Sequence, residues 1–447
     1  MLIAQDTIAA IATPPGNGGV GIIRISGALV TEIAKHLLNK SLTPRHALFT
    51  SFIDERGDII DSGISLYFPA PASYTGEDIL ELQGHGGSVV LDMLLRRVLS
   101  LGARLANPGE FTERAFLNNK LDLAQAEAVA DLIESSTEQS VRSAQKSMQG
   151  LFSEQINELV TELTELRIYI EAAIDFVDEE IDFLTDGVVE SRITRLLHSL
   201  AKILKTAQQG RLLRDGMTVV LVGKPNAGKS SLLNALAGHE AAIVTDIAGT
   251  TRDVLREHIQ LDGMPLHIID TAGLRDSDNL IEKEGMRRAH QEILKADKIV
   301  LLIDAREHDS EEILNSLPDN IDLIKVYNKI DLLGIEPKLI KTKNGDECYL
   351  SIKTGQGMDL LKQHLKESVG FNDNTNDVFI ARRRHIEAIT SSHQLVENAL
   401  EQLQYKQAGE LVAEDLRQAQ MSLAEITGTV SSDDLLGKIF SSFCIGK

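Results

Sequence analysis

Residues 223–230 read Gly-Lys-Pro-Asn-Ala-Gly-Lys-Ser, and this segment constrains the fold more than any other part of the chain. Its glycine and lysine spacing is typical of a phosphate-binding loop, whose curled backbone points N–H groups at phosphate oxygens. The apolar run at 219–222 predicts a buried strand before it, and 231–237 predicts a helix whose positive N-terminal end faces the same phosphates. Lys229 adds a positive charge, and the Ser230 hydroxyl is placed to ligate Mg²⁺. The segment therefore predicts a nucleoside triphosphate site.

A later segment predicts the base. Asn328-Lys329-Ile330-Asp331 follows a strand-like run at 321–327. A carboxylate at Asp331 can accept both N–H donors on the guanine edge, which adenine cannot match. GTPases usually carry Ser-Ala-Lys further on to contact the guanine oxygen, and this chain has Ser351-Ile352-Lys353 there. Ile352 departs from that pattern, but a backbone N–H can still make the contact.

Between these two motifs, Asp270-Thr271-Ala272-Gly273 follows the strand-like run 266–269. We expect Asp270 to hold Mg²⁺ through water and the Gly273 N–H to contact the γ-phosphate. Each tetrapeptide alone is a weak signal. Their order and spacing, each at the end of a predicted strand, together predict a GTPase.

Composition sets the outer limits. A chain of 447 residues is too long for one ordinary core and suggests about three domains. No apolar run is long enough to span a membrane, and no signal-peptide pattern begins the chain, so a cytoplasmic protein is expected. Cys348 and Cys444 are far apart in the sequence, which argues against a disulfide framework or a structural zinc site. A net charge of −21 predicts that any RNA contact is local or shared with a partner.

Three kinds of sequence predict a multidomain α+β and α/β protein. Residues 1–118 mix β-type runs with helical stretches, which predicts an α+β domain. Residues 119–212 and 376–447 are helical in pattern, and 216–372 alternate strands and helices like a Ras-like P-loop GTPase domain. We therefore expect the GTPase domain to be inserted into a discontinuous helical bundle, with Asn372 to Asp377 as a hinge. The predicted buried positions are Phe152, Ile156, Leu159, Leu163, Leu166, Ile170 and Ile174, and later Leu411, Val412, Leu416, Ala419, Leu423 and Ile426.

The predicted catalytic machinery departs from that of Ras-like proteins. Where those proteins carry a Gln that orients the attacking water, this chain has Leu274, so another group must position the water. The acidic candidates in the following segment are Asp276, Asp278, Glu282 and Glu284, although charged loop residues are usually only solvated. Asn226 offers an amide oxygen that could ligate a cation beside the β- and γ-phosphates; alternatively it only stabilises the turn.

The chain as a whole resembles the MnmE (TrmE) family of tRNA modification GTPases. The segments that carry the resemblance are the loop with Asn226, Thr245 to Asp253, Gly21 to Gly27, Tyr74 to Leu82, Pro108 to Asp122 and the terminal Phe443-Cys-Ile-Gly-Lys447. The resemblance implies K⁺-dependent GTP hydrolysis through dimerisation of GTPase domains. K⁺ would be held by Asn226, Thr245, Ile247 and Thr250, Mg²⁺ by Ser230 and Thr251, and Glu282 would be catalytic, acting through water.

The resemblance also implies the remaining GTP contacts. The full expected set is Asn226, Ala227, Gly228, Lys229, Ser230, Ser231, Thr245, Asp246, Ile247, Ala248, Gly249, Thr250, Thr251, Asp270, Thr271, Ala272, Gly273, Asn328, Lys329, Ile330, Asp331, Ser351, Ile352 and Lys353.

In the N-terminal domain, the resemblance implies a folate site at a dimer interface, for 5-formyl- or 5,10-methylene-tetrahydrofolate. Its contacts would be Arg24, Glu81, Lys120 and the C-terminal Lys447. Carboxylates suit the pterin edge, and Arg and Lys suit the glutamate tail. For Cys444 two readings stay open, a small buried hydrophobe or a thiol near the tRNA chemistry.

The implied reaction places a carboxymethylaminomethyl or aminomethyl group on carbon 5 of the wobble uridine, position 34, of certain tRNAs. The family works as a homodimer with the flavin-dependent partner MnmG in an α2β2 complex. Because the glycines at 16, 18, 19 and 21 do not form a Rossmann fingerprint, we place FAD on the partner. The GTPase would act as a conformational motor. Whether glycine or ammonium is the second substrate stays open.

A competing hypothesis is a ribosome-assembly or RNA-chaperone GTPase. It would need an RNA-binding module, and residues 84–87, Gly-His-Gly-Gly, fit the GxxG of a KH domain only weakly, because no Lys/Arg cluster follows until Arg96-Arg97. The run Arg382-Arg383-Arg384-His385 is the best local candidate for tRNA contact. A solvated or interdomain element is the alternative for that run.

Overall fold

The computed structural model describes residues 6–175, 187–237, 256–270, 296–307, 311–314, 322–342, 345–372, 378–406, 408–430 and 432–446. The chain forms two compact units, each built from separated stretches of sequence. Unit 1 contains 1–130, 148–189 and 401–447, and unit 2 contains 131–147 and 190–400. Within the described residues, no helix combines the length and apolar content that a bilayer crossing requires.

Unit 1 is built on a mixed sheet whose strands run in the order β3-β4-β5-β2-β1-β6. The pairs are antiparallel except that β6 runs parallel to β1. The strands are β1 (Ile8–Ile11), β2 (Gly18–Ser26), β3 (Leu48–Ile53), β4 (Ile59–Phe68), β5 (Ile79–Gly86) and β6 (Arg104–Leu105). Helices α1 (Val30–Leu38) and α2 (Ser88–Ser100) contribute apolar side chains to the core of this sheet. The predicted α+β character of the N-terminal region is confirmed.

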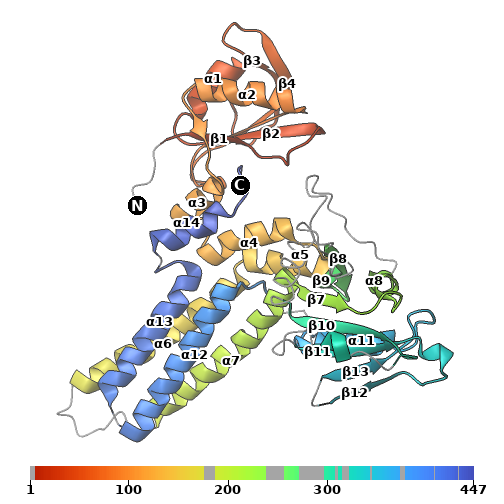
Figure 1. Ribbon diagram of the computed structural model, residues 1–447. Coiled ribbons are helices and arrows are strands. Elements are labelled where there is room, and N and C mark those ends of the chain that lie inside the picture. Colours follow the sequence, from red (N-terminus) through yellow and green to blue (C-terminus); the bar gives the residue numbers. More distant parts are fainter. Residues whose placement is uncertain are drawn as a thin grey trace. The chain divides into compact units, whose positions relative to one another are not determined.

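The helices of unit 1 follow the predicted apolar spacing. Helices α6 (Leu151–Asp175) and α13 (Gly409–Thr427) pack together, and Arg167 Nη1 donates to Gln420 Oε1 at 2.8 Å between them (Figure 1). On α6 the predicted positions are buried from Phe152 to Ile170, while Ile174 is half-buried. The remaining helices are α3 (Glu110–Leu117), α4 (Leu123–Glu134), which continues into unit 2, α14 (Asp433–Ser441) and the π-helical segment Gln402–Lys406.

One predicted core position on α13 is wrong. Leu411 is 49% exposed, whereas Val412, Leu416, Ala419, Leu423 and Ile426 are buried. The buried residues recur at steps of four, three, four and three, and Leu411 lies one residue before the first of them. Leu411 therefore lies outside the buried face of the helix, although it is apolar.

Unit 2 contains a second sheet, with strand order β12-β13-β11-β10-β7-β9-β8. The five central strands are parallel, and the edge strands β12 and β8 are antiparallel to their neighbours. The strands are β7 (Met217–Val222), β8 (Arg256–Leu261), β9 (Met264–Asp270), β10 (Lys298–Asp304), β11 (Leu323–Asn328), β12 (Lys338–Ile340) and β13 (Asp346–Tyr349). The helices are α5 (Glu138–Met148), α7 (Val188–Asp215), α8 (Lys229–Ala237), α10 (Glu311–Leu314), α11 (Met358–Ser368) and α12 (Arg383–Glu401), with a 3₁₀ turn at Ile330–Leu332.

Both faces of this sheet are covered, which explains the continuous apolar runs in its strands. On β7 and β10 alternate residues point to opposite sides: Val219 and Val300 belong to one apolar cluster, and Val220 and Leu301 to the other. The predicted strand at 219–222, the helix after it and the strand at 266–269 are confirmed. This architecture places the carboxyl ends of the parallel strands along one edge.

Candidate functional site: a guanine-nucleotide site

The predicted nucleotide motifs gather at that edge of the unit 2 sheet. Residues 223–228 connect β7 to α8, the segment Asn328 to Asp331 follows β11, and Ser351 to Lys353 follow β13. Asp270 is the last residue of β9. Segments more than 100 residues apart in sequence are thereby placed together, as the parallel topology requires.

The backbone of the phosphate-binding loop takes conformations that its residue types favour. Asn226 has φ of 64° and Gly228 has φ of 110°, in the left-handed region that Asn tolerates and Gly adopts freely. A Cβ on Gly228 would lie 2.6 Å from Asn328 Nδ2, so only glycine fits. Lys229 Nζ donates to the carbonyls of Gly223 at 2.7 Å and Lys224 at 3.3 Å. The Lys229 ammonium therefore lies within its own loop, near the place where phosphates are expected.

The side-chain amide of Asn328 joins three loops. Its Nδ2 donates to the Ala227 carbonyl at 2.9 Å, and its Oδ1 accepts from the backbone N–H groups of Lys329 at 2.8 Å and Ile352 at 3.1 Å. Ile352 donates to Asn328 through its backbone N–H, so this bond does not depend on the side chain that replaces the usual alanine. The hydroxyl of Ser351 donates to Asp331 Oδ1 at 2.7 Å, which fixes the carboxylate predicted to recognise guanine.

Asp304 and Arg306 lie beside this site and belong to none of the predicted motifs. Asp304, the last residue of β10, accepts from Lys329 Nζ at 2.7 Å, and Arg306 pairs with the same carboxylate. The hydrogen bonds from Arg306 come first among the causes that hold the pKa of Asp304 below its usual value; the Lys329 ammonium adds to them, and burial acts the other way. One signal was available in the sequence, because Asp304 ends an apolar strand as the predicted motifs do.

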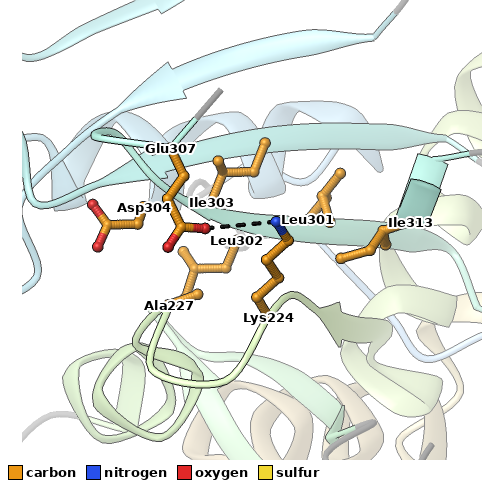
Figure 2. Close-up of a pocket in the computed structure, with 8 residues that line it drawn as sticks. All are labelled: Lys224, Ala227, Leu301, Leu302, Ile303, Asp304, Glu307 and Ile313. Carbon is orange, nitrogen blue, oxygen red and sulfur yellow. Dashed lines mark ion pairs between the residues drawn. The ribbon is translucent and has the colours of Figure 1, made fainter. Parts of the chain in front are cut away.

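The cavity beneath the phosphate-binding loop is too small for a nucleotide. Its volume is about 10 Å³, roughly the space of one water, and Lys224 and Glu307 face each other across it at 3.8 Å (Figure 2). It is lined by Lys224, Ala227, Leu301, Leu302, Ile303, Asp304, Glu307 and Ile313. This cavity therefore does not accommodate a nucleotide, whereas Asn226 and Ser230 of the same segment are exposed.

Several predicted residues lie outside the described part of the chain. They are Thr245, Asp246, Ile247, Ala248, Gly249, Thr250, Thr251, Thr271, Ala272, Gly273, Leu274, Asp276, Asp278, Glu282, Glu284 and Lys447, together with most of the expected hinge at 373–377.

Comparison with known proteins gives the family. The family model "GTP-binding protein TrmE N-terminus" matches residues 7–120, and the model "MnmE helical domain" matches 123–444. Proteins named tRNA modification GTPase MnmE from Hydrogenovibrio crunogenus and Histophilus somni are 56% and 58% identical to this chain. The alignments cover 99% of both chains for the first and 100% of both for the second. The chain belongs to the MnmE family.

The resemblance read from the sequence is thus confirmed, and with it membership of a family of GTP hydrolases. The MnmE of Yersinia pseudotuberculosis is 57% identical over 99% of each chain. Among solved structures, the G domain of the T. maritima FeoB iron transporter is similar over 34% of this chain and 98% of that one. It is 25% identical with a TM-score of 0.27, which is too low to support a conclusion.

In this MnmE-family chain, unit 1 brings together part of the predicted folate set. Arg24 on β2 and Glu81 on β5 are direct cross-strand partners, and Arg24 Nη2 lies 2.9 Å from Glu81 Oε1. The Arg24 guanidinium also lies 5.7 Å from the ring centroid of Tyr74 and 5.8 Å from that of Phe111. Burial, as the largest cause, raises the pKa of Tyr74. The pair therefore has an aromatic surround, in which charged hydrogen bonds are strengthened.

Lys120 and the C-terminal tail lie in the same unit. Lys120 is exposed, and its Nζ donates to the Pro71 carbonyl at 3.0 Å. Ile445 forms an antiparallel bridge with Pro108, and a Cβ on Gly446 would lie 2.3 Å from the Ile11 carbonyl of β1, the neighbour of β2. Gly446 therefore lies against the sheet that carries Arg24.

The two readings of Cys444 separate in the structure. Cys444 is exposed, so it is not a buried hydrophobe; the buried neighbour is Phe443. Cys348, on β13, is the buried cysteine.

The structure shows where the two RNA-contact candidates lie. Residues 84–87 end β5 and precede α2, so they are not the helix-to-helix loop of a KH domain. In the basic run, Arg382 binds the buried Asp131, and His385 is itself buried. These two residues therefore contribute to the packing of unit 2, whereas Arg383 of the same run is exposed and pairs with Glu387 at 2.8 Å.

Proposed function

We propose that this MnmE-family chain hydrolyses GTP at the loops joined by Asn328, and that hydrolysis drives modification of wobble uridine 34 in certain tRNAs. The observation that carries the proposal is the Asn328 amide, which ties the phosphate-binding loop to the guanine loops through bonds of 2.8 to 3.1 Å. Asp331 would accept from the guanine edge. The proposed domains are 1–118 for dimerisation and folate binding, 119–212 with 376–447 for the helical part, and 216–372 for GTP.

The proposed metals fit the donors that the structure describes. Asn226 presents an exposed amide and Ser230 an exposed hydroxyl, and neutral or hard oxygen donors suit K⁺ and Mg²⁺. The other proposed ligands are Thr245, Ile247 and Thr250 for K⁺ and Thr251 for Mg²⁺, with Glu282 acting on the attacking water. A K⁺ beside the phosphates would supply the positive charge that stabilises phosphoryl transfer, in place of an arginine finger. Pairing of two GTPase domains would complete the site.

The cation proposal is tested by GTP turnover in K⁺ and in Na⁺. We expect turnover to fall sharply when Na⁺ replaces K⁺, and Asn226→Lys to remove the dependence. Because Asn226 has a positive φ, Asn226→Gly is the matched control: it keeps the backbone conformation and deletes only the amide. That variant should lose K⁺ stimulation while remaining folded. Equal wild-type rates in both salts would count against the assignment.

The proposed folate site comprises Arg24, Glu81, Lys120 and Lys447. Arg24 and Glu81 are already paired at 2.9 Å, so a ligand would have to share or replace that ion pair. Arg24→Ala should weaken the binding of 5-formyl-tetrahydrofolate in calorimetry at least tenfold, by loss of charge-assisted hydrogen bonds. Arg56→Gln, in an exposed turn of the same domain, should leave it unchanged. No binding heat from the wild type would remove the site.

The proposed tRNA reaction needs a partner for its redox chemistry. MnmG would supply the FAD and NADH chemistry, in an α2β2 complex with the homodimer of this chain. Mass spectrometry of tRNA nucleosides from cells lacking this protein should show loss of the 5-carboxymethylaminomethyl or aminomethyl group at uridine 34. Normal nucleosides together with a ribosome-assembly defect would favour the competing RNA-chaperone function.

A further inference from the structure

Asp304 lies beside the guanine loop but belongs to none of the predicted motifs. It is the last residue of β10, and its direct neighbour on β11 is Asn328. Its side chain is only 7% exposed. A carboxylate so placed is costly unless cations compensate it.

Two cations meet at the Asp304 carboxylate. Arg306 binds it with Nε at 3.0 Å and Nη2 at 2.7 Å, and the Arg306 backbone N–H donates to it at 3.1 Å. Lys329 Nζ donates to Asp304 Oδ2 at 2.7 Å and to the Asn226 carbonyl at 2.9 Å. A continuous chain of contacts therefore runs from β10 through the guanine motif to the phosphate-binding loop.

The position of the Lys329 ammonium depends on the groups that accept its hydrogen bonds. Its ammonium is a compact charge on a flexible stem, so its position depends on what it binds. Asp304 supplies a fixed negative charge on a strand end, whereas the Asn226 carbonyl lies on a loop. The carboxylate stays ionised at neutral pH because Arg306, first, and Lys329 lower its pKa.

We propose that Asp304 is a positioning residue for guanine-nucleotide binding, which holds the Lys329 ammonium against the Asn226 carbonyl and so sets the base loop and the phosphate-binding loop together. The inference rests on the proposed GTP site. Asp304 acts through Lys329 and is not a catalytic residue.

The first test is GDP affinity of the full chain, by titration with a fluorescent GDP. Asp304→Asn should weaken binding about tenfold or more, the scale of one charge-assisted hydrogen bond. Glu307→Gln is the matched control on the same loop; its partner Lys224 is 3.8 Å away and Glu307 is 52% exposed, so GDP affinity should be unchanged. Wild-type affinity in Asp304→Asn overturns the proposal. A wild type that does not bind GDP refutes the proposed function instead.

A second variant separates positioning of Lys329 from anchoring of Arg306. Arg306 is 52% exposed, so Arg306→Gln should fold, and it leaves the Asp304–Lys329 contact in place. We expect its GDP affinity to stay within about threefold of the wild type, as for exposed ion pairs. A loss equal to that of Asp304→Asn would mean that Asp304 serves only Arg306, and would overturn the proposal.

A double-mutant cycle with Lys329→Met gives the readout that a purely structural role would not change. If Asp304 acts through Lys329, the double variant should bind GDP about as weakly as Lys329→Met alone. Additive losses would overturn the proposal. This cycle stays informative even when Asp304→Asn lowers the melting temperature.

Discussion

At the scale of single residues, Asn328 illustrates how little chemical freedom the site leaves. Its amide uses one donor and one acceptor, toward Ala227 in one direction and toward Lys329 and Ile352 in the other. An aspartate of the same shape would place an oxygen against the Ala227 carbonyl. The amide is required because the site needs a donor and an acceptor on one short, buried side chain.

The two cysteines should differ sharply in reactivity. Burial raises the pKa of Cys348 to about 12, so at pH 8 almost none of it is the nucleophilic thiolate. Cys444 is exposed. N-ethylmaleimide at pH 8 should therefore modify one thiol per folded chain, and a second only after denaturation. Mass spectrometry locates the label, and Cys444→Ser should abolish labelling of the folded protein; labelling of native Cys348 would contradict its burial.

At the scale of elements, ion pairs as well as apolar packing fix the position of α3. Arg114 on this helix binds Asp6 at 2.9 Å, Glu77 at 3.1 Å and Glu110 at 3.0 Å, and both Arg114 and Glu110 are buried. Arg104, next to β1, completes the network through Glu110 at 2.5 Å. The buried Glu110 carboxylate therefore binds two arginines, which satisfies the requirement that a buried charge be paired.

The network predicts an acid-sensitive helix. Burial alone would raise the pKa of Glu110, but hydrogen bonds from Arg104, the Asn107 N–H and Arg114 outweigh it and hold the pKa below its usual value. Its contribution is therefore present above the unfolded pKa of about 4.3 and is lost as pH falls through the lower folded value. Glu110→Gln should destabilise α3 by about 3 kcal/mol at pH 7. Hydrogen exchange of peptides spanning α3 measures this.

Glu113 on the same helix is the control with opposite sign. Burial, with the Glu110 charge, raises the pKa of Glu113, so its charged form opposes folding at neutral pH. Glu113→Gln should leave protection of α3 at pH 7 unchanged or higher. Equal losses of protection in both variants would show that the charge network does not hold the helix.

At the scale of the molecule, the segments that precede and follow the GTPase sheet both bind one buried carboxylate, that of Asp131. Arg214 lies in the last turn of α7, just before β7, and Arg382 precedes α12. Both bind Asp131, at 2.7 and 2.8 Å. Ser147 Oγ accepts from the Ile380 N–H at 2.9 Å nearby, and Gly210 allows the Phe379 carbonyl to approach α7, where a Cβ would lie 1.8 Å from it. Within unit 2, the two connections are therefore fastened together.

Removal of that carboxylate should loosen unit 2. Asp131→Ala removes the buried carboxylate that Arg214 and Arg382 share, and the expected loss is about 3 to 5 kcal/mol. Asp215→Asn is the control: Asp215 also pairs with Arg214 but is 39% exposed, so its loss should stay below about 1 kcal/mol. Thermal unfolding and limited proteolysis at 214–216 and 378–382 measure both. Equal stability of the two variants would contradict the fastening role.

The sequence by itself determined the nucleotide chemistry, the family and the element pattern. A phosphate cradle is built from the backbone of eight consecutive residues, so its signature is local and readable. The apolar periods at 219–222 and 152–170 are equally local, and both became the expected elements.

Only the tertiary structure decided which distant side chains meet. Asp304 reaches Lys329 because β10 and β11 are neighbours, and Asp131 reaches arginines 83 and 251 residues away. The exposure of Leu411 and Cys444 was likewise fixed by packing. Such pairings depend on strand order and on the rotation of helices about their axes. A single sequence does not show whether a charged or apolar residue contacts a distant residue or water.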